Sequence, residues 1–429
     1  MQDGYFNLSG TRLHCLQDGG IMEHWKQKIS LFLTSQAISL LGSSLVQYAI
    51  IWYITLTTQS GVMMTLSTLC GVIPQVIISP FAGVWADRYN KKMLIMVSDG
   101  MIAISTLIIA LCFLAGIDSV WLLFVVLAIR SLGTGVQTPT TTAFIPEVVP
   151  EGKLMKINGI NSTIQSIMLI LSPALSGALL ANFDLGYIFF IDVITAVIGI
   201  GIFSFVTVPF RKKNTEKIDY FQSIKEGISY TKENKLITKM LVYLMIFNFL
   251  IVPFATLTPL LVTRTFGAEA WYLTVNEMVF FVGSIIGGVL ISTWGGFHDR
   301  VKTIGIACLI CGLFGILLGM PFHFVFYLVC IGVMGITMPF MNTPFITMFQ
   351  ETVDTDKQGR IFALITMLTG AIMPLGMILY GPLADIVKIE YILIITGVLF
   401  VVGTCILLRD QTLRKMAHES GQKEEKSTI

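Results

Sequence analysis

Long apolar runs alternate with short polar segments along almost the whole chain. A transmembrane helix needs about 20 predominantly apolar residues, and each run is close to that length or longer. The pattern therefore predicts an all-α integral membrane protein with twelve transmembrane helices. The predicted spans cover residues 30–56, 62–85, 93–115, 119–144, 157–182, 186–208, 237–263, 271–296, 302–320, 323–349, 360–384 and 390–408.

A polar stretch divides the twelve spans into two sets of six. Its Phe and Ile side chains are separated by Lys and Glu, which predicts one or two short helices along the inner membrane surface. The polar first 21 residues lack the apolar core of a signal peptide and are predicted to be a disordered extension. The expected parts are an extension (1–21), an N-terminal six-helix bundle (22–208), a cytoplasmic linker (209–236), a C-terminal six-helix bundle (237–409) and a cytoplasmic tail (410–429).

Composition and charge support a membrane location and indicate an orientation. The chain is 54% hydrophobic and 13% charged, whereas soluble domains carry about 25% charged residues. A net charge of +2 gives no sign of a nucleic-acid partner. Lys and Arg gather in alternate loops, and the opposite loops hold only Arg264 and Lys388. The positive-inside rule then predicts a protein of the cell membrane, embedded in the lipid bilayer, with both termini in the cytoplasm.

Several features of the first half of the chain recur in the second half. Residues 83–92, between the second and third spans, form a charged turn with the sequence GVWADRYNKK. Charges at this density cannot lie in hydrocarbon, so the turn is expected at a membrane surface. The recurrences predict two pseudo-symmetric bundles. They pair Asp87-Arg88 with Asp299-Arg300, Glu147 with Glu351 and Pro173 with Pro374.

The charged turn also carries a resemblance to a known family. Its pattern, Gly-x-x-x-Asp-Arg-x-x-(Arg/Lys)-(Arg/Lys), resembles the signature loop of the major facilitator superfamily, and a weaker copy lies between the eighth and ninth spans. The runs WADRYNKKMLIMVSD and AIRSLGTGVQTP look most like the bacterial macrolide-efflux branch of its drug:proton antiporters. The resemblance implies two parallel six-helix repeats around a central site that opens to alternate faces of the membrane.

By the same resemblance, the charged turns are expected to form a conformational latch on the cytoplasmic side. Asp99, at the inner end of the third span, is expected to pair with the first turn. The predicted latch residues are Gly83, Asp87, Arg88, Lys91, Lys92, Asp99, Asp299 and Arg300.

Four charged side chains lie inside the predicted spans and away from their ends, namely Asp99, Arg130, Asp192 and Glu277. An ionisable residue at a helix centre costs roughly 2.5 to 3.5 kcal/mol on insertion scales, so each is a functional candidate. Arg130-x-x-Gly-x-Gly resembles the family's fourth-helix motif, which is linked there to proton transfer; a purely structural ion pair is the alternative. Glu277 or Asp192 is expected to carry the proton, with Glu277 preferred, and either can pair with Arg130.

Polar side chains at helical spacing form stripes on the first and fifth spans. Such stripes either bond neighbouring helices or line a pore. Aromatic and Met side chains accompany Asn residues in the seventh and tenth spans, and adaptable apolar walls with few polar anchors suit a bulky amphiphile. The predicted substrate-binding residues are Gln36, Ser43, Gln47, Trp52, Asn161, Gln165, Asn248, Phe249, Met338 and Asn342.

These features predict a monomeric exporter that exchanges bulky amphiphilic small molecules, of macrolide type, for protons. The sequence holds no phosphate-binding loop, so ATP does not power it directly. The alternatives are an exporter of an endogenous metabolite such as a siderophore and, more remotely, a non-transporting membrane sensor. No enzyme activity, cofactor or metal site is expected, because no catalytic set lies in the spans and the seven cysteines are scattered.

Overall fold

The computed structural model describes residues 25–207, 228–297, 299–320, 323–354 and 357–410. Within these ranges, twelve helical segments are long and apolar enough to cross a membrane. The twelve predicted spans are therefore confirmed. The predicted extension, most of the linker and nearly all of the tail lie outside the described residues. The described end of the linker is helical over residues 228–233.

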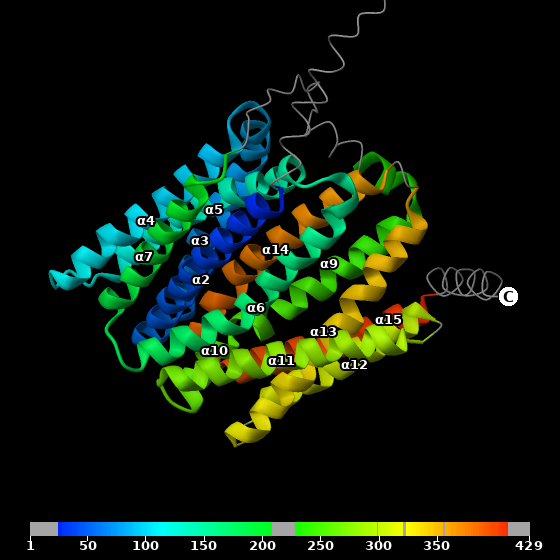
Figure 1. Ribbon diagram of the computed structural model, residues 1–429. Coiled ribbons are helices and arrows are strands. Elements are labelled where there is room, and N and C mark those ends of the chain that lie inside the picture. The colour runs from blue at the N-terminus through cyan, green and yellow to red at the C-terminus, as the bar shows by residue number, and fades with distance from the viewer. Residues whose placement is uncertain (1–24, 208–227, 298, 321–322, 355–356, 411–429) are drawn as a thin grey trace, which may run out of the picture. The chain divides into compact units, whose positions relative to one another are not determined.

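The helices of each half follow one another through short connections (Figure 1). In the first half they are α2 (Trp25–Thr58), α3 (Gly61–Arg88), α4 (Lys91–Leu114), α5 (Val120–Val148), α6 (Leu154–Leu180) and α7 (Leu185–Ser204). In the second half they are α9 (Lys235–Thr256), α10 (Thr258–Thr265), α11 (Ala270–Trp294), α12 (Arg300–Leu318), α13 (Phe324–Thr352), α14 (Gln358–Ile386) and α15 (Ile389–Arg409).

The seventh predicted span is confirmed as a membrane span, but it is divided between two helices. α9 ends at Thr256, and α10 begins at Thr258 with Pro259 in its first turn. Proline has no backbone N–H to continue the helical hydrogen bonds, and its ring disfavours a helical conformation in the preceding residues. The chain therefore bends at Leu257, a change that hydropathy alone does not register.

The two Asp-Arg pairs occupy different positions, although the sequence suggested a repeat. Asp87 and Arg88 are the last residues of α3, whereas Asp299 is the N-cap of α12 and accepts a hydrogen bond from the Lys302 amide at 3.2 Å. In the first turn, Asn90 is the residue that caps the next helix. The cause lies in the second turn, where Gly295 and Gly296 adopt φ values of 76° and 82° and end α11 earlier.

The chain divides into two compact units, and three helices are shared between them. Unit 1 comprises residues 1–47, 74–172 and 186–215. Its described part contains α4, α5, α7 and one end each of α2, α3 and α6. Phe32, Phe144 and Phe203 pack together in its core with ring centroids 4.6 to 5.4 Å apart.

Unit 2 comprises residues 48–73, 173–185 and 216–429. It contains α9 to α15 and the other ends of α2, α3 and α6. α11 packs closely against α13. The contact is so tight that a Cβ atom on Gly283 would lie 2.4 Å from the Gly332 carbonyl oxygen. Small residues allow membrane helices this close approach. One end of each of α2, α3 and α6 thus belongs to the same compact unit as the second half of the chain.

Candidate functional site

Arg130 of α5 and Asp192 of α7 form a buried ion pair in unit 1. Their side chains are 4% and 0% exposed. The Asp192 carboxylate also accepts hydrogen bonds from the hydroxyls of Ser43 at 2.8 Å and Thr106 at 2.9 Å. Arg130 donates in addition to the Ser43 carbonyl oxygen at 2.8 Å. We call these four residues the buried ion pair cluster. It joins α2, α4, α5 and α7, and it uses Ser43 to hold Asp192.

A close contact between α2 and α7 positions this cluster. A Cβ atom on Gly42 would lie 1.8 Å from the Thr195 hydroxyl oxygen. Because glycine has no side chain, α2 approaches α7 closely enough for Ser43 to reach Asp192. Of the two carboxylates that the sequence offered to Arg130, the structure pairs Asp192.

Asp99 does not pair with the charged turn, which corrects the sequence prediction. It is 4% exposed, and the Gln137 side-chain amide donates to it at 2.5 Å. The basic residues of the turn bind elsewhere: Lys92 donates to the Ser204 carbonyl oxygen at 2.7 Å, and Lys91 pairs with Glu147. Two helical turns separate Asp99 from Lys92, so its carboxylate lies within the helix packing and not at the surface.

The remaining latch residues have varied surroundings. Arg88 is exposed, and a Cβ atom on Gly83 would meet nothing within 4 Å. The Asp87 side chain lies outside the described part. Arg300 pairs with Glu351, just as Lys91 pairs with Glu147.

These two ion pairs repeat between the halves at the start of the third and ninth spans. Sequence reasoning noted that Glu147 and Glu351 match, but it did not assign them to the charged turns. The sequence does indicate that the two glutamates are equivalent. Each follows a matching Thr-Pro pair in its helix, at Thr138-Pro139 and Thr343-Pro344.

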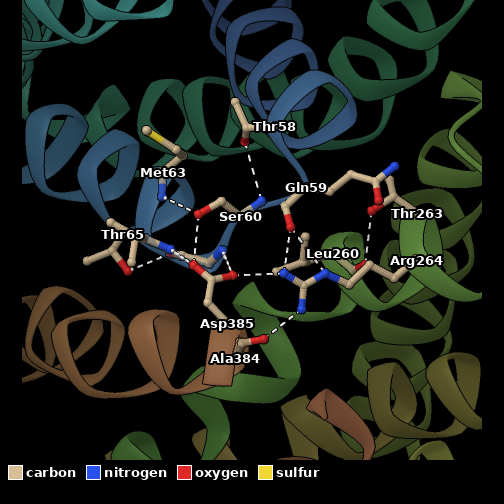
Figure 2. A network of polar contacts seen from close by, with 12 residues as sticks. Thr58, Gln59, Ser60, Met63, Thr65, Leu260, Thr263, Arg264, Ala384 and Asp385 are labelled. Atoms are coloured by element: carbon tan, nitrogen blue, oxygen red, sulfur yellow. Dashed lines mark hydrogen bonds and ion pairs between the residues drawn. The ribbon is translucent and has the colours of Figure 1, made fainter. Parts of the chain in front are cut away.

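A second polar network, which we call the α3–α14 clasp, lies entirely within unit 2 (Figure 2). The Asp385 carboxylate accepts hydrogen bonds from the Gly61 amide at 2.7 Å, the Val62 amide at 2.9 Å and the Ser60 hydroxyl at 2.8 Å. These are unsatisfied donors at the start of α3, so a residue from the end of α14 caps that helix. The clasp comprises Gln59, Ser60, Gly61, Arg264 and Asp385.

Arg264 at the end of α10 completes the clasp. Its guanidinium donates to Asp385 at 2.8 Å, to the Gln59 carbonyl oxygen and to the Ala384 carbonyl oxygen at 2.6 Å. In Figure 2 it lies between the connection from α2 to α3 and the end of α14. One arginine therefore holds both sides of the contact.

Two glycines bring the backbones together beneath the clasp. A Cβ atom on Gly61 would lie 2.0 Å from the Gly381 carbonyl oxygen, and one on Gly381 would lie 1.7 Å from the Thr65 hydroxyl oxygen. Thr65 donates to the Met377 carbonyl oxygen at 2.9 Å, across the same contact. α3 and α14 are thus packed backbone to backbone.

Sequence reasoning missed Asp385 as a functional residue. The eleventh predicted span ended at residue 384, so this carboxylate was counted with the loops. Arg264 was noted only as one of two basic residues in its set of loops. The available signal was the Gly381-Pro382 step, which marks a site of close helix approach one turn before Asp385.

Glu277 lies half-buried in α11 within unit 2. It interacts electrostatically with Tyr48 of α2 and Tyr327 of α13. Its neighbour Asn276 accepts a hydrogen bond from the Tyr327 hydroxyl at 2.8 Å. Among the described residues, no Lys or Arg forms an ion pair with Glu277.

Asn248 and Asn342, two of the predicted substrate-binding residues, line one pocket in unit 2. It has a volume of about 460 Å³ and is bounded by α9, α13 and α14. Apolar side chains supply much of the wall, and two threonines and a glutamine add polar groups. We call it the asparagine pocket; its remaining lining residues are Leu244, Phe345, Ile346, Phe349, Gln350, Phe362, Ile365, Thr366 and Thr369.

The other predicted substrate-binding residues do not gather at this pocket. Trp52 is 1% exposed and packs against Tyr48 at a centroid distance of 5.7 Å. Phe249 packs against Tyr380, and Met338 is half-buried.

The polar residues of the first and fifth spans vary in exposure. Gln36 accepts a weak hydrogen bond from Thr141 at 3.4 Å, and Gln47 is half-buried. Asn161 is half-buried and Gln165 is exposed. Of the predicted substrate-binding residues on these stripes, Ser43 contacts a buried charge, through its hydrogen bond to Asp192.

Known proteins resemble this chain over almost its whole length. The family model described as Major Facilitator Superfamily matches residues 32–377. Macrolide efflux protein A of Streptococcus pyogenes is 29% identical over 397 residues, covering 92% of this chain and 98% of that protein. The staphyloferrin A transporter of Staphylococcus aureus is 23% identical, covering 86% and 92%. A crystal structure of a peptide transporter, POT, shares the fold with a TM-score of 0.69 at 13% identity, covering 91% and 95%.

Proposed function

Because the chain belongs to the Major Facilitator Superfamily, we propose that it is a proton-coupled exporter of bulky amphiphilic compounds of macrolide type. The chain is a multi-pass membrane protein of a transporter family. Proton coupling, outward direction and the substrate class are what we propose beyond this. We also propose the orientation with both termini in the cytoplasm, on the distribution of Lys and Arg.

The environment of Glu277 is the observation that carries the proton step. A carboxylate in a transmembrane helix is costly when charged, and no described cation neutralises this one. Binding a proton removes that cost. Asp192 is already engaged by Arg130, Ser43 and Thr106, so its protonation would require Arg130 to lose its partner. We assign proton carriage to Glu277 and a structural role to the buried ion pair cluster.

The asparagine pocket supports a mostly apolar small-molecule substrate. Its volume of about 460 Å³ lies within the 300 to 1,000 Å³ of small-molecule sites, which combine apolar walls with a few polar anchors. Asn248 and Asn342 supply amide donors and acceptors from opposite helices. The relative named Macrolide efflux protein A makes macrolides the first class to test.

The α3–α14 clasp supports alternating access. With both termini in the cytoplasm, the clasp lies at the outer end of α3 and α14. It then closes the outer face, and it must open to release an exported compound outward.

Transport into everted membrane vesicles tests the proposal. We expect wild-type vesicles to accumulate a labelled macrolide when their lumen is acidic, and a protonophore to abolish this. Glu277→Gln should reduce gradient-driven uptake to the level of vesicles without the protein, because glutamine cannot carry a proton. Glu269→Gln, just before the first residue of the same helix, is the matched control and should retain uptake. Full activity of Glu277→Gln would contradict the assignment.

A second candidate is export of an endogenous metabolite such as a siderophore. The similarity to the staphyloferrin A transporter favours it. The same vesicles distinguish the two candidates, because a labelled siderophore should then be accumulated and an unlabelled macrolide should fail to compete with it.

A further inference from the structure

A groove runs between the first turns of α2 and α6 in unit 1. Its volume is about 770 Å³, and its walls come from residues 25–38 of α2, from Lys153 just before α6 and from residues 156–164 of α6. At 1.5 Å per residue the α2 wall is roughly 20 Å long. The hydrocarbon of one membrane leaflet is about 15 Å deep, so the groove is long enough to follow an acyl chain through one leaflet.

The end of this groove nearest the helix starts is strongly basic. Lys26, Lys153 and Lys156 line it, and all three are exposed. No acidic side chain in the described part forms an ion pair with any of them. Trp25 lies at the same end, and tryptophan favours the membrane–water interface. Three positive charges therefore face one opening, and no acidic side chain among the described residues pairs with them.

The rest of the groove is mainly apolar. Ile29 and Leu33 of α2 face Ile157, Ile160 and Ile164 of α6. Their spacing of three or four residues places each set along one face of its helix. The groove thus combines a basic opening with an apolar channel parallel to the helices.

We propose that this groove binds an anionic phospholipid of the membrane leaflet on that face. The phosphate would contact Lys26, Lys153 and Lys156, and one acyl chain would lie along the isoleucines. Charge complementarity favours this occupant, since basic pockets between transmembrane helices on the cytoplasmic side bind anionic headgroups and that leaflet is rich in anionic lipid. A neutral lipid would leave the three ammonium groups uncompensated.

Native mass spectrometry of the purified full-length protein tests the charge requirement. Phosphatidylglycerol and phosphatidylcholine with identical chains are added, and the bound lipid is counted. We expect phosphatidylglycerol to bind at least tenfold more tightly. Lys26→Gln/Lys153→Gln/Lys156→Gln should lose roughly fivefold in affinity per lysine, whereas Lys232→Gln/Lys302→Gln/Lys388→Gln should bind as wild type. Equal binding of the two lipids, or equal losses in the two triple variants, would overturn the proposal.

A second variant tests the apolar part without removing charge. Ala37 lines the groove, and Ala37→Phe should fill it and reduce phosphatidylglycerol binding several-fold while the lysines remain. Triple replacement of the lysines by arginine should preserve binding and controls for loss of fold. Competition by inorganic phosphate as effective as that by the lipid, or undiminished lipid binding by Ala37→Phe, would show that no acyl chain occupies the groove.

Discussion

The buried ion pair cluster and the α3–α14 clasp both join an arginine to an aspartate, but their surroundings are opposite. Arg130 and Asp192 are 4% and 0% exposed, whereas Arg264 and Asp385 are 31% and 26% exposed. Separation of the first pair would leave two buried charges, each without an opposite charge beside it. Separation of the second would let water replace the lost contacts. From this difference we infer that the same Arg–Asp chemistry is a permanent contact in unit 1 and a contact that can open in unit 2.

The largest expected difference between the two pairs comes from replacing the aspartate of each by asparagine. Asp192→Asn leaves the Arg130 charge buried and unpaired, and we expect it to lower the free energy of unfolding by about 3 to 5 kcal/mol. Asp385→Asn should lower it by about 1 kcal/mol, because its partner remains partly hydrated. Thermal unfolding of the detergent-purified variants measures both. The account is wrong if the two losses are equal.

A double variant shows whether the charge or the shape of the buried pair matters. Arg130→Met/Asp192→Leu removes both charges, and such replacements are often neutral or stabilising. We expect it to recover most of the stability lost in Asp192→Asn. Transport by this variant would also separate a structural role of the pair from a role in proton coupling.

A pair of glycine substitutions in α3 should have an intermediate effect. Gly61→Ala places a methyl group against the Gly381 carbonyl oxygen and should cost about 1 to 3 kcal/mol, as overpacking does. Gly83→Ala meets open space and should be neutral or slightly stabilising. Hydrogen exchange at the Val62 amide, which the clasp protects, measures the local effect. Unchanged protection in Gly61→Ala would show that the backbones separate at no cost.

The half-exposed ion pairs at the charged turns should give the smallest effect. Glu147 and Glu351 are 35% and 33% exposed, and we expect Glu147→Gln or Glu351→Gln to cost at most about 1 kcal/mol. A double-mutant cycle of Glu147→Gln with Lys91→Gln isolates the interaction. A coupling free energy above roughly 2 kcal/mol would show that these pairs behave like the buried Arg130–Asp192 pair instead.

Hydropathy alone predicted all twelve spans, because each transmembrane helix needs about 20 predominantly apolar residues. Positions within the spans were harder to assign. Sequence narrowed the partner of Arg130 to Asp192 or Glu277, and only packing, with Gly42 letting α2 approach α7, distinguishes them. The break at Leu257 was missed because proline changes backbone hydrogen bonding without lowering hydropathy.

The clasp shows why long-range contacts resist prediction. Asp385 and Gly61 are 324 residues apart, and a carboxylate at a helix end reads as an ordinary surface residue. The glycines beneath the clasp are equally hard to recognise from sequence. A glycine at a close helix–helix contact and a glycine in open space look the same in the sequence. Gly83 lies in the recognisable motif but meets open space, whereas Gly61 lies outside it and makes the tight contact.

We propose that the α3–α14 clasp opens during transport while the buried ion pair cluster stays closed. The most direct test is Ser60→Cys/Asp385→Cys in a variant without the native cysteines. The two side chains are in contact, because the Ser60 Oγ and Asp385 Oδ2 atoms lie 2.8 Å apart. We predict that oxidation abolishes vesicle transport and that a reductant restores it, while Ser60→Cys alone is insensitive to oxidant. Full transport by the crosslinked protein would contradict the claim.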